Sequence, residues 1–238
     1  ANGGAAVLNS DLVFDGGTLH FDVLNSSQAA LTVNGTISAA SDTAGMNLTF
    51  ADTDALQLGV KYLLASGDWS AMEDRISLFT PELYKQMTLE TGNSGLSIQL
   101  DMKEGFAYWG GNYSEVQPGN KLVFMGGEGN LSRLEITGGA QADTAVFDNE
   151  ADFTISSTDG SALAIGTMGK YDTGALVVNT NVTADTLLVE DTSALKGTGK
   201  LAVGEISGTG TLQVAGGAHL QVESGEGATL QLLNASKL

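Results

Sequence analysis

The sequence predicts an all-β protein, built either as a β-solenoid or as stacked β-sandwiches of short strands. Apolar and polar residues alternate over many short runs, which is the pattern of a strand with one buried face. Glycine is abundant, with 32 residues against two prolines, and aromatic residues make up only 6% of the chain, as in proteins of short strands and tight turns. Apolar residues still reach 42% of 238 residues, which is enough for a real core.

The expected strands are β-branched or leucine-rich runs bounded by Gly, Asn, Asp or Ser. In chain order they fall within residues 11–23, 29–38, 47–52, 95–102, 120–127, 132–139, 151–157, 174–180, 185–191, 199–205, 210–225 and 228–234. Because side chains alternate between the two faces of a strand, each run should turn its apolar residues to the interior.

Residues 68–92 depart from this alternation. Apolar residues recur there at steps of three and four, which favours a helix; they are Met72, Ile76, Phe79, Leu83 and Met87. Pro81 would have to begin a second segment, because proline cannot donate the hydrogen bond that a helix interior requires. The sequence therefore predicts an irregular insertion with one short helix near residues 68–92.

Two β domains are expected, covering residues 1–107 and 108–238. Two aromatic clusters, two glycines and Pro118 interrupt the strand pattern near the boundary, as is common between domains. Beyond it, Leu-x-Val runs recur at 201–203, 212–214 and 220–222, with Leu-x-Leu at 230–232. Such regular spacing favours stacked rungs or a sandwich of short strands.

Charge excludes several classes of function. Twenty-eight acidic residues face ten basic ones, a net charge of -18, which repels the phosphates of nucleic acids. No Lys/Arg cluster is present to hold an anionic membrane, and no apolar run approaches the ~20 residues of a spanning helix. We therefore expect no nucleic-acid partner and no membrane insertion by this segment.

Candidate metal and cofactor sites are scarce. The chain has no cysteine, which excludes disulfides, thiol nucleophiles and Cys-zinc sites. Asp52 and Asp54 could offer oxygens to Ca²⁺, but neither the EF-hand spacing nor the Gly-Gly-x-Gly-x-Asp repeat is present. His20 and His219 lie in alternating strands, and no Gly-x-Ser-x-Gly elbow accompanies them. We predict no cofactor and no metal.

Several stretches resemble the passenger regions of autotransporter proteins and the autotransporter-associated β-strand repeats of Gram-negative surface proteins. Residues 206–222, ISGTGTLQVAGGAHLQV, are similar to the rung pattern of those repeats, with glycine at the corners. Residues 11–23, 30–38 and 56–69 resemble their closing segment, and AYWGGN at 107–112 the opening of the next unit. The resemblance implies a β-solenoid or β-sandwich that is secreted or held on the outer-membrane surface. The opening ANGGAAVLNS suggests a mature product or an excised piece of a longer protein.

Asp172 has two interpretations. Asp172-Thr173-Gly174-Ala175 fits the catalytic loop of an aspartic peptidase, in which two carboxylates share one proton. The nearest second copy, at Asp191, lacks the glycine and lies too close in sequence for a two-lobed enzyme, so only a dimer contributing Asp172 twice would serve. Asp-Thr pairs also recur as turn formers, as in SDTAG and QADTAVF, and the turn interpretation is favoured.

Four aromatic residues are the candidates for ligand binding. They are Trp69, Tyr108, Trp109 and Tyr113, which cluster around the irregular stretch and the domain junction. Flat rings stack on sugar faces, although core packing is the commoner role of such residues.

Three functions follow from the sequence. The first is an exported, cell-surface or secreted structural and adhesive module, in contact with extracellular glycans or glycoproteins. The second is a secreted aspartic peptidase acting on glycoproteins such as mucin through Asp172. The third is a discrete carbohydrate-binding module that uses the tryptophan region. Oligomeric state is left open by all three.

Overall fold

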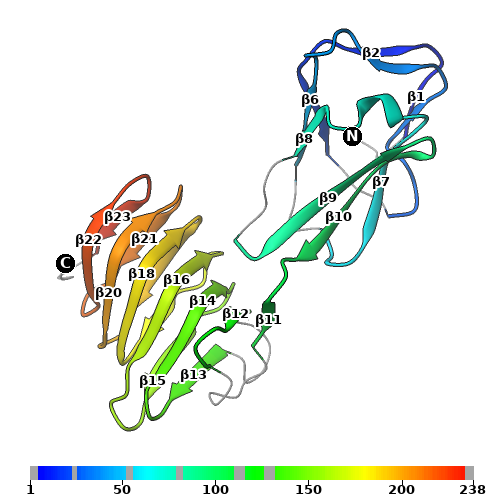
Figure 1. Cartoon of the computed structure of the whole chain (residues 1–238). Coiled ribbons are helices and arrows are strands. Elements are labelled where there is room, and N and C mark those ends of the chain that lie inside the picture. The colour runs from blue at the N-terminus through cyan, green and yellow to red at the C-terminus, as the bar shows by residue number, and fades with distance from the viewer. Residues whose placement is uncertain are drawn as a thin grey trace. The chain divides into compact units, whose positions relative to one another are not determined.

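The computed structural model describes residues 5–22, 26–51, 56–78, 83–109, 116–125 and 132–233. The chain divides between Lys103 and Glu104 into two compact units (Figure 1). The boundary predicted from the sequence follows residue 107. Both units consist almost wholly of strands, which confirms the all-β fold class.

The first unit winds through three short sheets whose strands stack in parallel. One sheet contains β1 (Ala6–Leu8), β4 (Leu31–Val33) and β7 (Lys61–Ser66), the second β2 (Leu12–Phe14) and β5 (Ile37–Ala39), and the third β3 (Thr18–Phe21), β6 (Met46–Phe50) and β8 (Ile76–Leu78). Leu31 lies beside Ala6, and Ile37 lies beside Leu12. Each turn of the chain therefore stacks on the previous one, as in a solenoid.

An antiparallel hairpin follows this parallel coil. It consists of β9 (Lys85–Gly92) and β10 (Gly95–Met102), and β10 also pairs antiparallel with β7. The first sheet therefore has the order β1-β4-β7-β10-β9, with a change of strand direction at β10.

The stretch at 68–92 is more regular than predicted. Among its described residues, the helical content is one 3₁₀ turn, η1 (Ser70–Met72), and the others include β8 and β9. Within β9 the half-buried Met87 and Leu89 alternate with exposed residues, so a period of two prevails there over the helical spacing. Phe79 and Pro81 lie outside the described residues.

The second unit is a parallel β-solenoid with two ladders. One has the order β11 (Phe106–Tyr108), β12 (Lys121–Phe124), β14 (Ala140–Asp148), β16 (Leu163–Tyr171), β18 (Asn181–Val189), β20 (Lys200–Ser207) and β22 (His219–Gly225). The other has the order β13 (Arg133–Ile136), β15 (Phe153–Ser157), β17 (Leu176–Val178), β19 (Thr192–Lys196), β21 (Thr211–Val214) and β23 (Thr229–Leu232). Figure 1 shows these strands side by side in chain order. The solenoid alternative of the fold prediction is thus confirmed.

Register in this solenoid is set by columns of buried aliphatic residues. Leu163, Val182, Leu201 and Leu220 are successive partners across four rungs, and each is at most 2% exposed. A shift of one residue would turn such a column to the solvent. At the other end of the unit, the rings of Trp109, Phe124, Phe147 and Phe153 pack against one another.

The pairing of the long strands is interrupted near two Asp-Thr pairs. Asp143-Thr144, a predicted turn former, lies inside β14 rather than in a loop, and Asp185-Thr186 lies inside β18. Pairing nevertheless skips Asp143, Asp185 and their partner Gly166 in the ladder. A Cβ at Gly166 would lie 2.7 Å from the carbonyl oxygen of Asp143, so the chain comes closer at this point than a side chain permits.

Two Gly-Thr-Gly turns join the rungs of the second unit. Gly197 and Gly208 have φ values of 104° and 114°, and a Cβ on either would lie about 2 Å from a carbonyl oxygen of the rung below. Only glycine satisfies both the positive φ and the close approach. Thr198 donates its N–H to Asn179, and Thr209 donates its hydroxyl to Glu190, each bond crossing one rung of 19 residues.

Candidate functional site

Asp172 lies in the turn between β16 and β17. Its φ of 61° is in the left-handed region that aspartate tolerates better than most residues. Its Oδ1 accepts a hydrogen bond from the N–H of Thr173 at 2.6 Å, and its own N–H donates to Oδ2 of Asp191 at 2.9 Å. The two Asp-Thr sequences are therefore neighbours, joined through a backbone amide.

The carboxyl of Asp172 has the contacts of a turn residue. A catalytic aspartate of this class shares a proton with a second carboxyl group. Within the described part of the chain, the hydrogen bonds of the Asp172 carboxyl go to Thr173 alone, the next residue of the same turn. A dimeric site that uses two copies of Asp172 stays a prediction.

Lys170, two residues before Asp172 in β16, is a buried lysine that the sequence analysis does not single out. Its partners in the ladder are Phe147 and Val189, both core residues, and it is itself 1% exposed. Its inward position follows from the pairing with Val189, 19 residues further on. The ladder register is therefore the signal that could have found it.

The amine of Lys170 lies under the Asp172 turn. It donates hydrogen bonds to the backbone carbonyls of Tyr171 and Asp172, the latter at 2.8 Å. Burial lowers the pKa of Lys170 to about 8, against the opposing effect of the negative charges on Asp172, Asp148 and Asp191. The amine is therefore held by two backbone carbonyls, and the negative charge of three aspartates favours its protonated form.

Both tryptophans of the predicted aromatic site are buried, each in the core of its own unit. Trp69 is 0% exposed in the core of the first unit, where its ring lies 5.9 Å from that of Phe14. Trp109 is 5% exposed in the core of the second unit, and Tyr108 is 47% exposed. Tyr113 lies outside the described residues. Because a buried ring cannot stack on a sugar, Trp69 and Trp109 act here as core residues.

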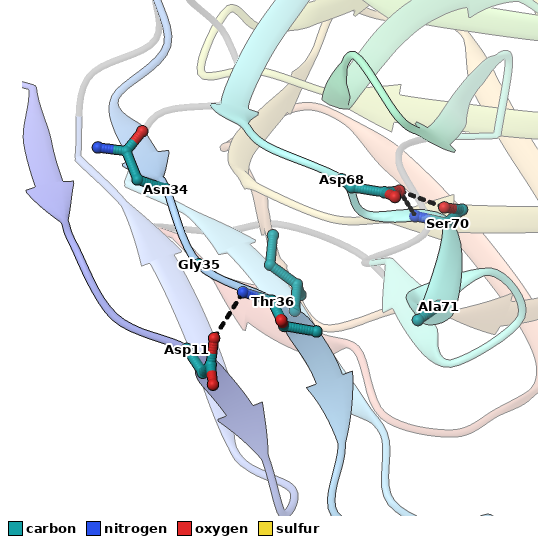
Figure 2. Close-up of a pocket in the computed structure, with 8 residues that line it drawn as sticks. Asp11, Asn34, Gly35, Thr36, Asp68, Ser70 and Ala71 are labelled. Atoms are coloured by element: carbon teal, nitrogen blue, oxygen red, sulfur yellow. Dashed lines mark hydrogen bonds between the residues drawn. The ribbon is translucent and has the colours of Figure 1, made fainter.

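The neighbours of Trp69 do reach a surface. They help to form a hollow of about 440 Å³ on the first unit, which we call the polar hollow (Figure 2). Its lining residues are Asp11, Asn34, Gly35, Thr36, Ile37, Asp68, Ser70 and Ala71. They come from the connection between β1 and β2, from the connection between β4 and β5 with the first residue of β5, and from Asp68 with the 3₁₀ turn η1. Consecutive turns of the coil therefore build the hollow together.

Turn hydrogen bonds fix the polar groups of the hollow. Asp11 accepts the N–H of Thr36 at 2.8 Å, and Asp68 accepts both the N–H of Ser70, at 3.1 Å, and its hydroxyl (Figure 2). Asn34 donates its side-chain amide to Asn9 at 2.7 Å. These contacts hold the side chains in place, so the hollow is pre-formed.

The hollow is rich in hydrogen-bond acceptors. The hydroxyl and then the amide of Ser70 lower the pKa of Asp68, so its carboxylate is ionised near neutral pH. Among the described residues, Oδ2 of Asp11, Oδ2 of Asp68 and Oδ1 of Asn34 have no hydrogen-bond partner. The hollow can therefore accept hydrogen bonds from a ligand that carries hydroxyl or amine groups.

Other kinds of site find no support in the described ranges. No group of three or more His, Cys, Asp or Glu side chains there could hold a metal ion. No helix of those ranges is long and apolar enough to cross a membrane.

Fold and surface together define the class as a parallel β-solenoid protein with a pre-formed polar hollow. Comparisons with protein-family models, with curated proteins and with solved structures found no match.

Proposed function

We propose that the chain is a structural and adhesive module of an exported, cell-surface protein, and that it contacts extracellular glycans or glycoproteins through the polar hollow. The observation that carries the proposal is the set of fixed, unpartnered acceptor oxygens on Asp11, Asn34 and Asp68. Sugar hydroxyls are donors of the matching kind, and sites of this kind bind with a few well-placed polar groups. Export and surface location rest on the resemblance to autotransporter passengers.

A regular scaffold also suits this role. The columns of aliphatic residues and the tight glycine turns of the second unit give a rigid support made of short repeats. Solenoids of this type present extended surfaces for binding rather than deep catalytic pockets.

Glycan binding can be tested with a variant that fills the hollow. Ala71 is an exposed lining residue in a 3₁₀ turn, so Ala71→Arg should obstruct the hollow without entering the core. We expect saturable binding of the unmodified protein to at least one glycan of a mucin-type panel, and a loss of at least about tenfold in affinity, or ~1.4 kcal/mol, in the variant.

The matched control is Ala151→Arg, which adds the same side chain at an exposed alanine of the second unit. This control should bind as the unmodified protein does. Absence of saturable binding to every glycan, or equal binding by both arginine variants, would contradict the proposal.

A further inference from the structure

We infer that Asn34 is a site of spontaneous deamidation, which converts one wall of the polar hollow from an amide to a carboxylate. Asn34 is followed by Gly35, and the pair lies in the connection between β4 and β5 rather than in a strand. Asn34 is exposed. The inference concerns the covalent chemistry of this turn and holds whether or not the hollow binds glycans.

The hydrogen bonds around the turn leave one backbone amide free. Asn34 donates its N–H to the carbonyl of Leu8, and Thr36 donates its N–H to Asp11, both at 2.8 Å. In the described part of the chain, the N–H between them, that of Gly35, has no hydrogen-bond partner. It is therefore the amide of this turn whose nitrogen can be deprotonated without breaking a bond of the fold.

The reaction needs only this nitrogen and water. The deprotonated nitrogen of Gly35 attacks Cγ of Asn34, a C–N bond forms, the Cγ–Nδ2 bond breaks, and ammonia leaves with the proton returned from water. The resulting five-membered succinimide is opened by one water molecule at either carbonyl. The products are aspartate or isoaspartate at position 34, and no oxidant or further reactant is used. Glycine favours the attack because it has no Cβ beside the nucleophile.

The products change the hollow in a defined way. Either one places a third carboxylate beside Asp11 and Asp68 and removes the amide donor that Asn34 gives to Asn9. Isoaspartate also adds one backbone atom to a turn that leaves no spare room, because a Cβ at Gly35 would lie 2.4 Å from the backbone of Ser10.

A matched control tests the role of the free amide. Thr198→Asn adds an exposed Asn-Gly pair to the second unit, but there the N–H of Gly199 donates to the carbonyl of Val178 at 2.8 Å. After incubation of the folded protein at mildly alkaline pH, we expect conversion at Asn34 and at least about tenfold slower conversion at the Thr198→Asn site. A urea-unfolded sample should convert both pairs at similar rates.

Conversion is measured by the masses of the peptides released by a protease that cleaves on the N-terminal side of aspartate. Cleavage at Asp22 and Asp42 releases residues 22–41, which also contain Asn25, followed by serine, as an internal reference. Aspartate at position 34 creates a new cleavage site, whereas isoaspartate leaves the fragment whole but one mass unit heavier. The Asn34→Gln variant should yield neither product. An Asn34 that persists in the folded protein while the unfolded sample converts, or equal rates at the two folded Asn-Gly pairs, would overturn the inference.

Discussion

Gly208 lies so close to Val189 in the rung below that a Cβ on it would stand 2.0 Å from the Val189 carbonyl oxygen. Gly217 also has a positive φ, of 90°, but a Cβ there would meet open space. A side chain at Gly217 would therefore meet backbone strain alone, whereas a side chain at Gly208 would meet both strain and steric overlap.

Substitution of these glycines should have unequal effects on stability. Gly217→Ala carries only the cost of a left-handed alanine, about 1 to 2 kcal/mol. Gly208→Ala adds overlap with backbone atoms and should cost about 3 kcal/mol or more. Urea unfolding of both variants would measure the difference, and equal losses of free energy would show that Gly208 is not needed for close stacking.

The buried Lys170 should make stability depend on alkaline pH. Its pKa is near 8 in the folded state and close to 10.4 in the unfolded chain. At pH values between these two pKa values, the unfolded chain keeps the proton and the folded protein has lost it. The free energy of unfolding should therefore rise as the pH rises across this window. Below about pH 8 the charge on the buried amine should lower the free energy of unfolding by up to about 3 kcal/mol, and above about pH 10.5 this loss should be absent.

Lys170→Met removes that pH dependence, and Lys200→Met, at an exposed position of β20, is the control. We expect the difference in unfolding free energy between the Lys170 variant and the unmodified protein to change mainly between about pH 8 and about pH 10. The Lys200 variant should show no such trend. A Lys170 variant that tracks the unmodified protein at every pH would contradict the assigned burial.

Asp159 should stabilise the fold until the solution becomes acidic. Its carboxylate accepts hydrogen bonds from the N–H groups of Gly138 and Ser161 and from the hydroxyl of Ser157. The hydroxyl and amide of Ser161 and the amide of Gly138 are the main causes that hold its pKa far below the usual value. A depressed folded pKa gives stability above the unfolded pKa, near 3.9, which is lost as pH falls toward the folded pKa.

The matching experiment is thermal unfolding of Asp159→Ala beside Asp185→Ala, whose aspartate is exposed and lies in the ladder interruption of β18. Near neutral pH the Asp159 variant should melt at a lower temperature than the unmodified protein, and the Asp185 variant should not. The deficit should shrink below about pH 4. A constant deficit at all pH values would mean that the charged form is not what the turn requires.

Asp172→Asn should leave the fold intact. Asparagine also tolerates the left-handed region, and its Oδ1 can still accept the N–H of Thr173. We expect unfolding free energy within about 1 kcal/mol of the unmodified protein. Because the variant stays folded, it also tests the peptidase alternative: pepstatin-sensitive proteolysis at acid pH that survives the substitution cannot depend on Asp172.

Much of the solenoid could be predicted from the sequence because its signal is local. The Leu-x-Val runs at 201–203, 212–214 and 220–222 became inward-facing pairs in β20, β21 and β22. Their alternation of apolar and polar residues predicts a strand, and the flanking glycines predict the turn. Strand β10 was predicted as the run 95–102, but β9 was less visible, since Met72, Ile76 and Met87 also fit a helical period.

The candidate sites could not be predicted in the same way, because they depend on which rungs become neighbours. Asp11, Asn34 and Asp68 are far apart in sequence, and only the stacking of successive turns brings them to one hollow. Trp69 is a candidate for sugar binding because of its flat ring, but the residues next to it in sequence do not indicate that the ring points into the core. The charge of Lys170 predicts an exposed side chain, whereas its pairing with the buried Val189 places it in the interior of the solenoid.

The 19-residue repeat has an evolutionary consequence. Because Asn181 pairs with Lys200 and Leu201 with Leu220, deleting or duplicating residues 181–199 would restore the same partners one rung along. Recombination could then lengthen or shorten this unit in steps of ~4.8 Å without a change in the sequence of any turn. The unit would therefore evolve in length by whole rungs.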